Sequence, residues 1–202
     1  MKSIDARLAD IRAEQDQNRK NLLVAEIVCE FFRRVGADPV IVGGSAVEFY
    51  TEGTYVSGDV DICFNGPRLP SPRERESVLS EVGSSLGVRN WDVAGVLVDL
   101  LGAVETCART PFQEIGKLKP IQIEDLIAER ILIATVPRYS EERWKVAKLL
   151  LAVALNKLVE FDRGELERVA NSAHYRVGSE LKRLIDEIES ESEDRSKENL
   201  PR

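Results

Sequence analysis

VIVGGSAVEFY at residues 40–50, followed by SGDVDICF at residues 57–64, predicts a strand, a glycine turn, a short helix and a second strand. The β-branched run that opens the first segment is typical of a buried strand. Gly43 and Gly44 allow a tight turn and let backbone N–H groups approach a ligand without interference from a Cβ atom. Ser45 falls where a helix would begin, and a helix N-terminus favours anions. We therefore expect these three residues to form a phosphate cradle.

Two acids follow on the second strand. Asp59 and Asp61 alternate with Val60, Ile62 and Phe64, so the apolar residues are expected to face a core. Both carboxylates then share the opposite face, roughly 7 Å apart at Cα. Such a pair suits Mg²⁺, which commonly uses one or two carboxylates together with phosphate oxygens.

Taken alone, each feature has a plainer interpretation. Gly43-Gly44 could be an ordinary turn, and the two aspartates could be the solvated side of an amphipathic edge strand. The order strand, Gly-Gly-Ser, helix, strand-borne Asp59-Val-Asp61 favours a site, because independent elements agree in order and spacing.

This constellation resembles the nucleotidyltransferase superfamily of DNA polymerase beta. More narrowly, residues 43–61 resemble small prokaryotic nucleotidyltransferase-like proteins, some of whose relatives act as toxins or antitoxins. The resemblance implies an α/β fold, with a mixed sheet, flanking helices and a helical C-terminal part. It also implies that a third carboxylate on a later strand completes the site. Asp99 in Val-Asp99-Leu fits this role, although a structural salt bridge would explain it equally well; Asp92 is a weaker candidate because its surroundings look like a loop.

The resemblance implies a Mg²⁺-dependent (or Mn²⁺-dependent) enzyme that transfers an NMP from an NTP to an RNA, protein or small-molecule acceptor. Asp59, Asp61 and Asp99 would be the metal ligands and catalytic residues, and Gly43-Gly44-Ser45 would bind the nucleotide. The alternative is a catalytically weak protein of this fold that acts as an antitoxin or regulatory binding partner. It is motivated by residues 141–148, which lack the Lys-Asp pair and further acid of toxin-like members.

Arg130 is a further nucleotide-binding candidate. It lies four residues after Leu126 and three after Ile127, so on a helix it belongs on or beside their apolar face. In the proteins that this chain resembles, a lysine or arginine of the corresponding helix approaches the nucleotide. A salt bridge to a core carboxylate such as Asp99 is the equally weighted alternative.

Composition limits the partners. The net charge of −7 disfavours bulk DNA binding. Residues 186–198 account for −5 of this charge, so the rest of the chain is compatible with a local basic patch that binds a tRNA end. The expected partners are an NTP and an acceptor such as tRNA or protein, and a partner protein or homo-oligomer is left open. No apolar stretch is long enough to span a membrane. Three scattered cysteines favour a reducing, cytoplasmic location.

The pattern also predicts the element order. One or two helices should precede Gly36, and helices should be interrupted at residues 135–140. A helix is expected at 72–85, where Pro72 and Glu74 suit a first turn. The expected strands are 39–42, 59–64 and 96–101, with short ones around 105–109 and 118–123. The expected domains are 1–123 (N-terminal helix and nucleotidyltransferase-like α/β domain), 124–189 (helical subdomain) and 190–202 (disordered acidic tail).

Overall fold

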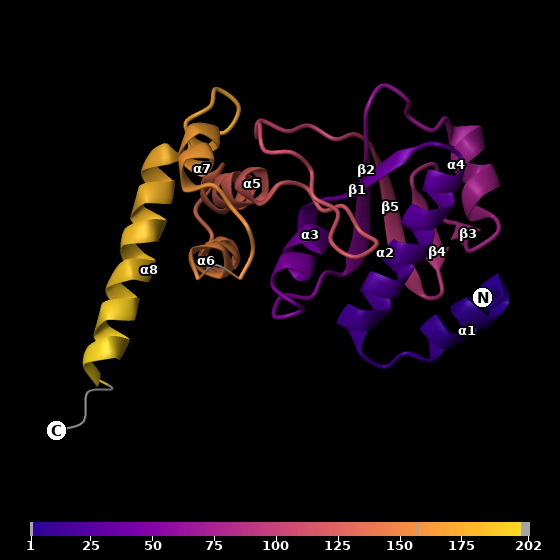
Figure 1. Ribbon diagram of the computed structural model, residues 1–202, viewed down its shortest axis with the longest axis horizontal. Helices are drawn as coiled ribbons and strands as arrows, with labels where there is room; N and C mark the ends of the chain where they lie inside the picture. Colours follow the sequence, from indigo (N-terminus) through magenta and orange to yellow (C-terminus); the bar gives the residue numbers. More distant parts are fainter. Residues whose placement is uncertain (1, 157, 199–202) are drawn as a thin grey trace. The chain divides into compact units, whose positions relative to one another are not determined.

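The computed structural model describes residues 2–156 and 158–198, and its contacts divide the chain into two compact units. The first comprises Met1–Thr106 and Phe112–Ile121, and the second comprises Cys107–Pro111 and Gln122–Arg202 (Figure 1). The chain therefore passes between the units more than once, whereas the sequence interpretation placed one boundary after residue 123.

Five strands form the mixed sheet of the first unit: β1 (Asp38–Ile41), β2 (Asp59–Asn65), β3 (Ser84–Ser85), β4 (Asn90–Val93) and β5 (Val96–Ala103). Their order in the sheet is β1-β2-β5-β4-β3. Strands β2 and β5 run parallel, and the other neighbouring pairs are antiparallel. The predicted fold class, a mixed α/β sheet with flanking helices, is confirmed.

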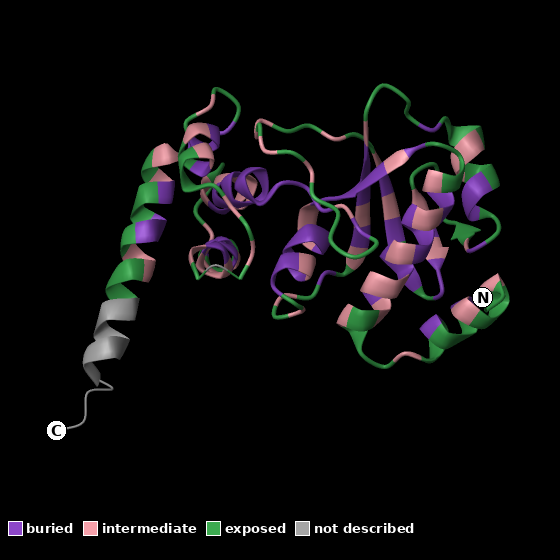
Figure 2. Ribbon diagram, in the orientation of Figure 1, coloured by how far each residue is buried: buried purple, intermediate pink, exposed green. Residues whose placement is uncertain are grey.

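Four helices accompany this sheet: α1 (Ile4–Ala13), α2 (Gln17–Arg34), α3 (Gly43–Tyr50) and α4 (Pro72–Leu79). Helix α2 covers one sheet face, where its Phe32 ring meets Phe64 of β2 edge to face, with 4.9 Å between ring centroids. Val60 and Ile62 of β2 are buried on the same face, α2 contributes the buried Ile27 and Val28, and Figure 2 shows buried residues along the strands. The apolar residues of β2 thus face a core as predicted, which leaves its aspartates on the opposite face.

Helix α4 begins where its sequence signal lies and ends earlier than expected. Ser71 Oγ accepts from the Glu74 N–H at 3.3 Å, and the Glu74 carboxylate accepts from the Ser71 N–H at 2.9 Å, which is a capping box. The prediction that this helix continues to residue 85 is wrong. Gly83 lies against β4, where a Cβ would come within 2.4 Å of the Asp92 carbonyl oxygen, and Ser84–Ser85 pair with β4.

The predicted strand at residues 105–109 is wrong. The N–H groups of Cys107 and Ala108 each donate to the Asp125 carboxylate at 2.8 Å instead of to a neighbouring strand. A buried acid of the second unit therefore satisfies the backbone of this segment, and sequence alternation alone does not reveal such a partner.

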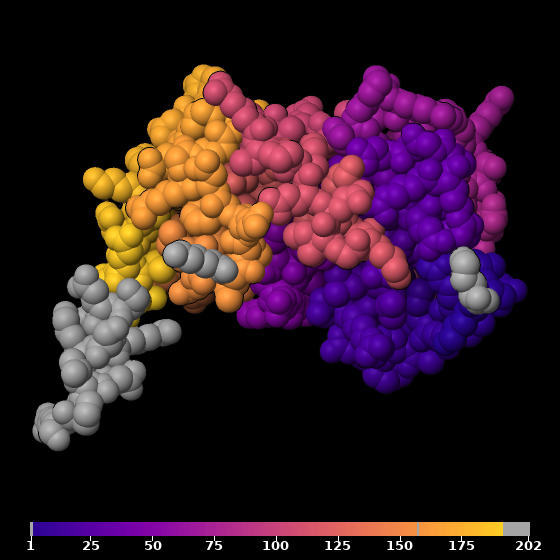
Figure 3. Space-filling view, viewed as in Figure 1, coloured from indigo at the N-terminus to yellow at the C-terminus, as the bar shows by residue number. Residues whose placement is uncertain are grey.

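Pro120 forms an isolated parallel bridge with Ile41, and the strand predicted at residues 118–123 is also wrong. The Ile41 N–H donates to the Lys119 carbonyl, and the Ile121 N–H donates to the Ile41 carbonyl, both at 2.8 Å. Pro120 lies between them and has no N–H to extend the ladder. Figure 3 shows this part of the chain against α2, whose Arg33 donates to the Lys117 carbonyl at 2.7 Å.

The second unit contains α5 (Ile123–Thr135), α6 (Glu141–Leu155), α7 (Arg163–Ala170) and α8 (Gly178–Glu198). Its apolar core includes the fully buried Ile131, Leu150 and Leu184. The helix break predicted at residues 135–140 is confirmed between α5 and α6. Within the described ranges, no helix combines the length and apolarity needed to cross a bilayer.

Helix α8 extends into the acidic segment. The sequence interpretation placed a disordered tail from residue 190, but the described backbone is helical to Glu198. Glutamate is a good helix former, so an acidic Ser/Glu-rich composition does not by itself end a helix. Residues 199–202 lie outside the described residues.

Candidate active site

One face of the sheet in the first unit carries a row of carboxylates. The parallel register of β2 and β5 places Asp61 beside Asp99 and Asp59 beside Leu97. Directly paired residues, and residues two apart on a strand, share a face, and adjacent strands lie about 4.8 Å apart. The structure therefore brings the three predicted acids onto one face, with Asp61 and Asp99 as immediate neighbours.

Strand β4 extends this face. Its antiparallel register puts Asn90 opposite Asp99, and Asp92 two residues further along the same side. Trp91 and Val93, which alternate with them, are 3% and 0% exposed. The interpretation of Asp92 as a loop residue is therefore wrong. The polar-apolar alternation of residues 90–93 is typical of a strand and could have predicted it.

Asp99 forms an ion pair with Arg89. Its Oδ2 accepts from Arg89 Nη2 at 3.1 Å, while its Oδ1 is buried and has no hydrogen-bond partner in the part of the chain that the structure describes. The Asp99 side chain is 15% exposed and that of Arg89 is 57% exposed. The salt bridge considered for Asp99 thus exists, with a cation from the end of the β3–β4 connection.

Gly43 and Gly44 allow α3 to approach β2 closely. Gly43 has φ of +61°, and a Cβ on it would lie 2.4 Å from Asp61 Oδ2. A Cβ on Gly44 would lie 2.7 Å from Ser57 Oγ. The Asp61 carboxylate therefore lies against the first turn of α3, where the helix dipole favours negative charge.

Ser45 links α3 to β2. Its hydroxyl donates to the Asp59 carbonyl and accepts from the Asp61 N–H, each at 2.8 Å. A hydroxyl has only one proton to donate, so in this arrangement Ser45 Oγ cannot also donate to a phosphate. A contribution of Ser45 to nucleotide binding would then come from its backbone N–H and from holding the two aspartates in place.

A buried polar network lies behind these residues and was not foreseen from the sequence. Glu48 of α3 is 2% exposed, and its Oε2 accepts from the Ser57 N–H and from Asn21 Nδ2, both at 3.0 Å. The same Asn21 group donates to the Ser57 carbonyl at 3.1 Å, and Ser57 Oγ donates to Asp59 Oδ1 at 3.2 Å. Burial raises the pKa of Glu48, and the hydrogen bonds from Asn21 and Ser57 oppose that rise. An acid within the otherwise apolar stretch AVEFY was the only sequence signal.

Arg130 belongs to the second unit. It lies on α5, and its guanidinium forms an ion pair with Glu129 at 2.9 Å. Its Nε is buried and lacks a hydrogen-bond partner among the described residues. Its nucleotide-binding role stays a prediction.

The donor set of the carboxylate face suits a hard divalent cation. Asp59, Asp61 and Asp99 offer only oxygen ligands, and the unpartnered Asp99 Oδ1 is a buried acceptor that a cation would satisfy. Over residues 2–156 and 158–198, no three His, Cys, Asp or Glu side chains are arranged to hold a metal ion as they stand. The residue types and their face fit Mg²⁺ or Mn²⁺, and a side-chain adjustment would be required.

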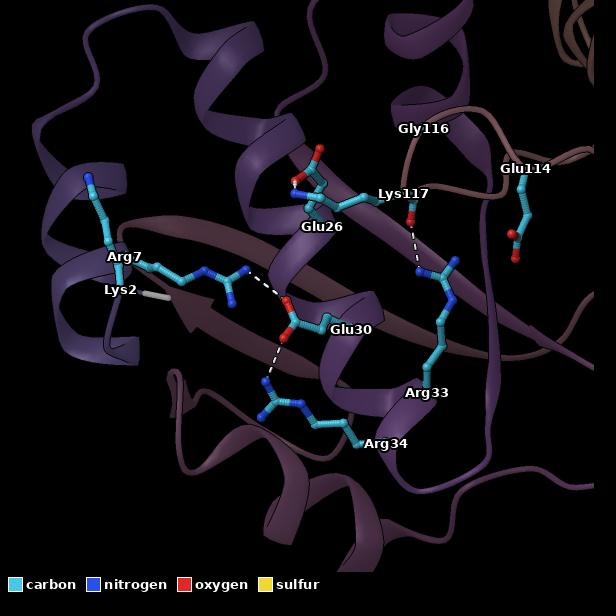
Figure 4. A pocket seen from close by; sticks show the side chains of 9 residues that line it. All are labelled: Lys2, Arg7, Glu26, Glu30, Arg33, Arg34, Glu114, Gly116 and Lys117. Carbon is cyan, nitrogen blue, oxygen red and sulfur yellow. Dashed lines mark hydrogen bonds and ion pairs between the residues drawn. The ribbon is translucent and has the colours of Figure 1, made fainter.

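An open groove of about 880 Å³ elsewhere on the first unit has side chains of both charges (Figure 4). Glu30 pairs with Arg7 at 2.8 Å and with Arg34 at 2.5 Å, and Lys117 pairs with Glu26 at 2.7 Å. Because these charges largely satisfy one another, the groove does not indicate a ligand. None of the predicted site residues lines it; the lining residues are Lys2, Arg7, Glu26, Glu30, Arg33, Arg34, Glu114, Gly116 and Lys117.

Solved structures with this arrangement of elements identify the fold. The solution structure of the antibiotic-resistance factor ANT(2'')-Ia matches with a TM-score of 0.54 and 13% identity, over 83% of this chain and 98% of that one. An antigenic nucleotidyltransferase-like protein from Paracoccidioides brasiliensis matches with a TM-score of 0.54 and 13% identity, over 85% and 93% of the two chains. The chain has a nucleotidyltransferase fold.

A crystal structure of ANT(2'')-Ia in complex with adenylyl-2''-tobramycin matches this nucleotidyltransferase fold with a TM-score of 0.50 and 17% identity, over 78% of this chain and 97% of that one. No family model and no curated protein matches the sequence. The superfamily resemblance predicted from residues 40–64 is therefore confirmed at the level of the fold.

Proposed function

We propose that this protein is a Mg²⁺-dependent or Mn²⁺-dependent nucleotidyltransferase that moves an NMP from an NTP to an acceptor and releases pyrophosphate. The observation that carries this proposal is the register of β2 and β5, which sets Asp59, Asp61 and Asp99 on one face. The close approach of Gly43 to Asp61 adds a helix N-terminus at the same place. Carboxylates that can hold a cation thereby lie next to backbone N–H groups that can bind a triphosphate, and nucleotidyl transfer requires both.

Each residue has a distinct task in this proposal. Asp59 and Asp61 hold the cation, and the N–H groups of Gly43 and Gly44 bind phosphate oxygens. Mg²⁺, when bound, neutralises the charge that develops on the triphosphate. Asp99 completes the ligand set or accepts the proton of the acceptor hydroxyl, whose oxygen forms a bond to the α-phosphorus as the bond to the β-phosphate oxygen breaks. Catalysis would depend mainly on positioning and charge neutralisation.

The proposed acceptor is a small molecule, an RNA or a protein. The complex with adenylyl-2''-tobramycin makes a hydroxylated small molecule one candidate, and RNA or protein are others. The net charge of −7 argues against long nucleic acids, since these are bound mainly through clustered cations.

The decisive test is transfer of label from each α-³²P-NTP, with Mg²⁺ or Mn²⁺, to pools of RNA, protein and metabolites including amino sugars. Wild type is compared with Asp61→Asn, which keeps the side-chain size, and with Asp186→Asn on the exposed face of α8 as a charge-matched control. We expect labelled acceptor with wild type and the control, and loss of about 10²-fold or more with Asp61→Asn. Absence of both transfer and metal-dependent NTP binding in folded wild type would disprove the proposal.

A catalytically weak binding protein is the second candidate. Two observations favour it: the Ser45 hydroxyl is committed to the β2 backbone, and Asp99 is paired with Arg89. Metal-dependent NTP binding without transfer, together with a stable complex with a protein partner, would establish this function in place of catalysis.

A further inference from the structure

The ion pair between Arg89 and Asp99 joins an exposed cation to a largely buried acid of the carboxylate face. The backbone of Arg89 is fixed because its carbonyl accepts from the Leu100 N–H at 2.9 Å. Its guanidinium, however, is 57% exposed and reaches Asp99 through a single contact at 3.1 Å. An exposed side chain on a fixed backbone can change rotamer without disturbing the sheet.

Asp99 is only partly neutralised by this contact. The Arg89 guanidinium contacts Oδ2, and Oδ1 is buried without a partner in the described residues. Arg75 also interacts electrostatically with Asp99, but its guanidinium donates its hydrogen bonds to the carbonyls of Leu100 and Leu101, at 2.9 and 3.0 Å. A buried carboxylate oxygen without a donor is costly, so Asp99 retains capacity for a second cation.

We propose that Arg89 is a built-in counter-ion of Asp99 that competes with a divalent cation. In this proposal, which rests on the proposed function, Arg89 must release Asp99 before that carboxylate joins Asp59 and Asp61 at the metal. The proposal explains why three acids on one face of the sheet are not arranged to hold a metal ion over the described ranges. Arg89 thereby lowers the affinity of the carboxylate face for a metal ion in the free protein. It also reduces the electrostatic repulsion between the carboxylates on the sheet.

The test measures Mn²⁺ binding without nucleotide, by electron paramagnetic resonance or calorimetry, in the full chain. Because a partly exposed ion pair contributes modestly, we expect Arg89→Gln to bind Mn²⁺ about two- to fivefold more tightly than wild type. Arg89→Lys retains the charge and should stay within about twofold of wild type. The matched control is Arg68→Gln, whose arginine is 61% exposed and paired with Glu74 at 2.8 Å, and it should bind like wild type.

Unchanged or weaker Mn²⁺ binding by folded Arg89→Gln would overturn the inference. If the role of Arg89 is purely structural, Arg89→Gln should have a lower melting temperature but should not bind Mn²⁺ more tightly. That outcome would also overturn the inference. Asp59→Ala/Asp61→Ala separates this failure from failure of the proposed function. If wild type and Arg89→Gln bind Mn²⁺ no better than this double variant, the metal site itself is wrong. If wild type binds Mn²⁺ better than the double variant and Arg89→Gln binds it as tightly as wild type, only the counter-ion role of Arg89 is wrong.

Discussion

Gly43 combines a left-handed backbone with direct proximity to the Asp61 carboxylate. We expect Gly43→Ala to lower the free energy of unfolding by more than the roughly 1–2 kcal/mol that left-handed strain costs, because the new Cβ must also displace Asp61. Gly116→Ala is the matched control: its φ of +64° resembles the +61° of Gly43, but nothing lies within 4 Å of its Cβ position. Urea unfolding measures both variants, and equal losses would show that the contact with Asp61 is unimportant.

Glu48 should give the first unit a recognisable dependence on pH. Burial raises its folded-state pKa above the ordinary 4.5, so the unfolded chain releases this proton first as the pH rises. The contribution of Glu48 to stability therefore declines from about pH 4.5 upward until the folded-state pKa is passed. Glu48→Gln should remove this decline, and the exposed Glu81→Gln should retain it. Urea unfolding from pH 4 to 8 tests this, and parallel curves for wild type and Glu48→Gln would contradict it.

At the scale of elements, the hydroxyl of Ser45 holds α3 on β2. Ser45→Ala leaves the Asp61 N–H without its acceptor and should cost about 1–3 kcal/mol of unfolding free energy. We also expect faster hydrogen exchange at the Asp61 amide. Ser71→Ala removes the capping box of α4 instead, at about 1 kcal/mol, and should leave that amide unchanged. Unaltered exchange at Asp61 in Ser45→Ala would mean that the link does not hold the two elements together.

At the scale of the whole molecule, Asp125 binds the segment Cys107–Pro111, which precedes the helices of the second unit in the sequence. This residue is 0% exposed and accepts from the Tyr175 hydroxyl at 3.1 Å as well as from two N–H groups of that segment. Tyr175→Phe should lower the free energy of unfolding by about 1.5–3 kcal/mol, since the lost bond is to a carboxylate. Limited proteolysis should then cut faster at 107–111, whereas Tyr139→Phe, at a 54% exposed tyrosine, should not change the rate.

Features that depend on near neighbours along the chain could be predicted from the residues alone. Alternation put Asp59 and Asp61 on one face and their apolar neighbours in the core, and Ser71 with Glu74 marked the start of α4. These follow from backbone geometry over a few residues. The order of Gly-Gly-Ser and Asp-Val-Asp is also local, and its resemblance to the nucleotidyltransferase superfamily was enough to predict the fold.

The partner of each polar group, in contrast, depends on the three-dimensional packing of the chain. The pairing of Asp99 with Arg89, the commitment of the Ser45 hydroxyl to β2 and the burial of Glu48 all depend on strand order and register. The segment at residues 105–109 failed as a strand for the same reason, since its N–H groups bond to Asp125 far along the chain. A side chain's type limits what it can bind, but long-range packing selects which of the possible partners lies within hydrogen-bond distance.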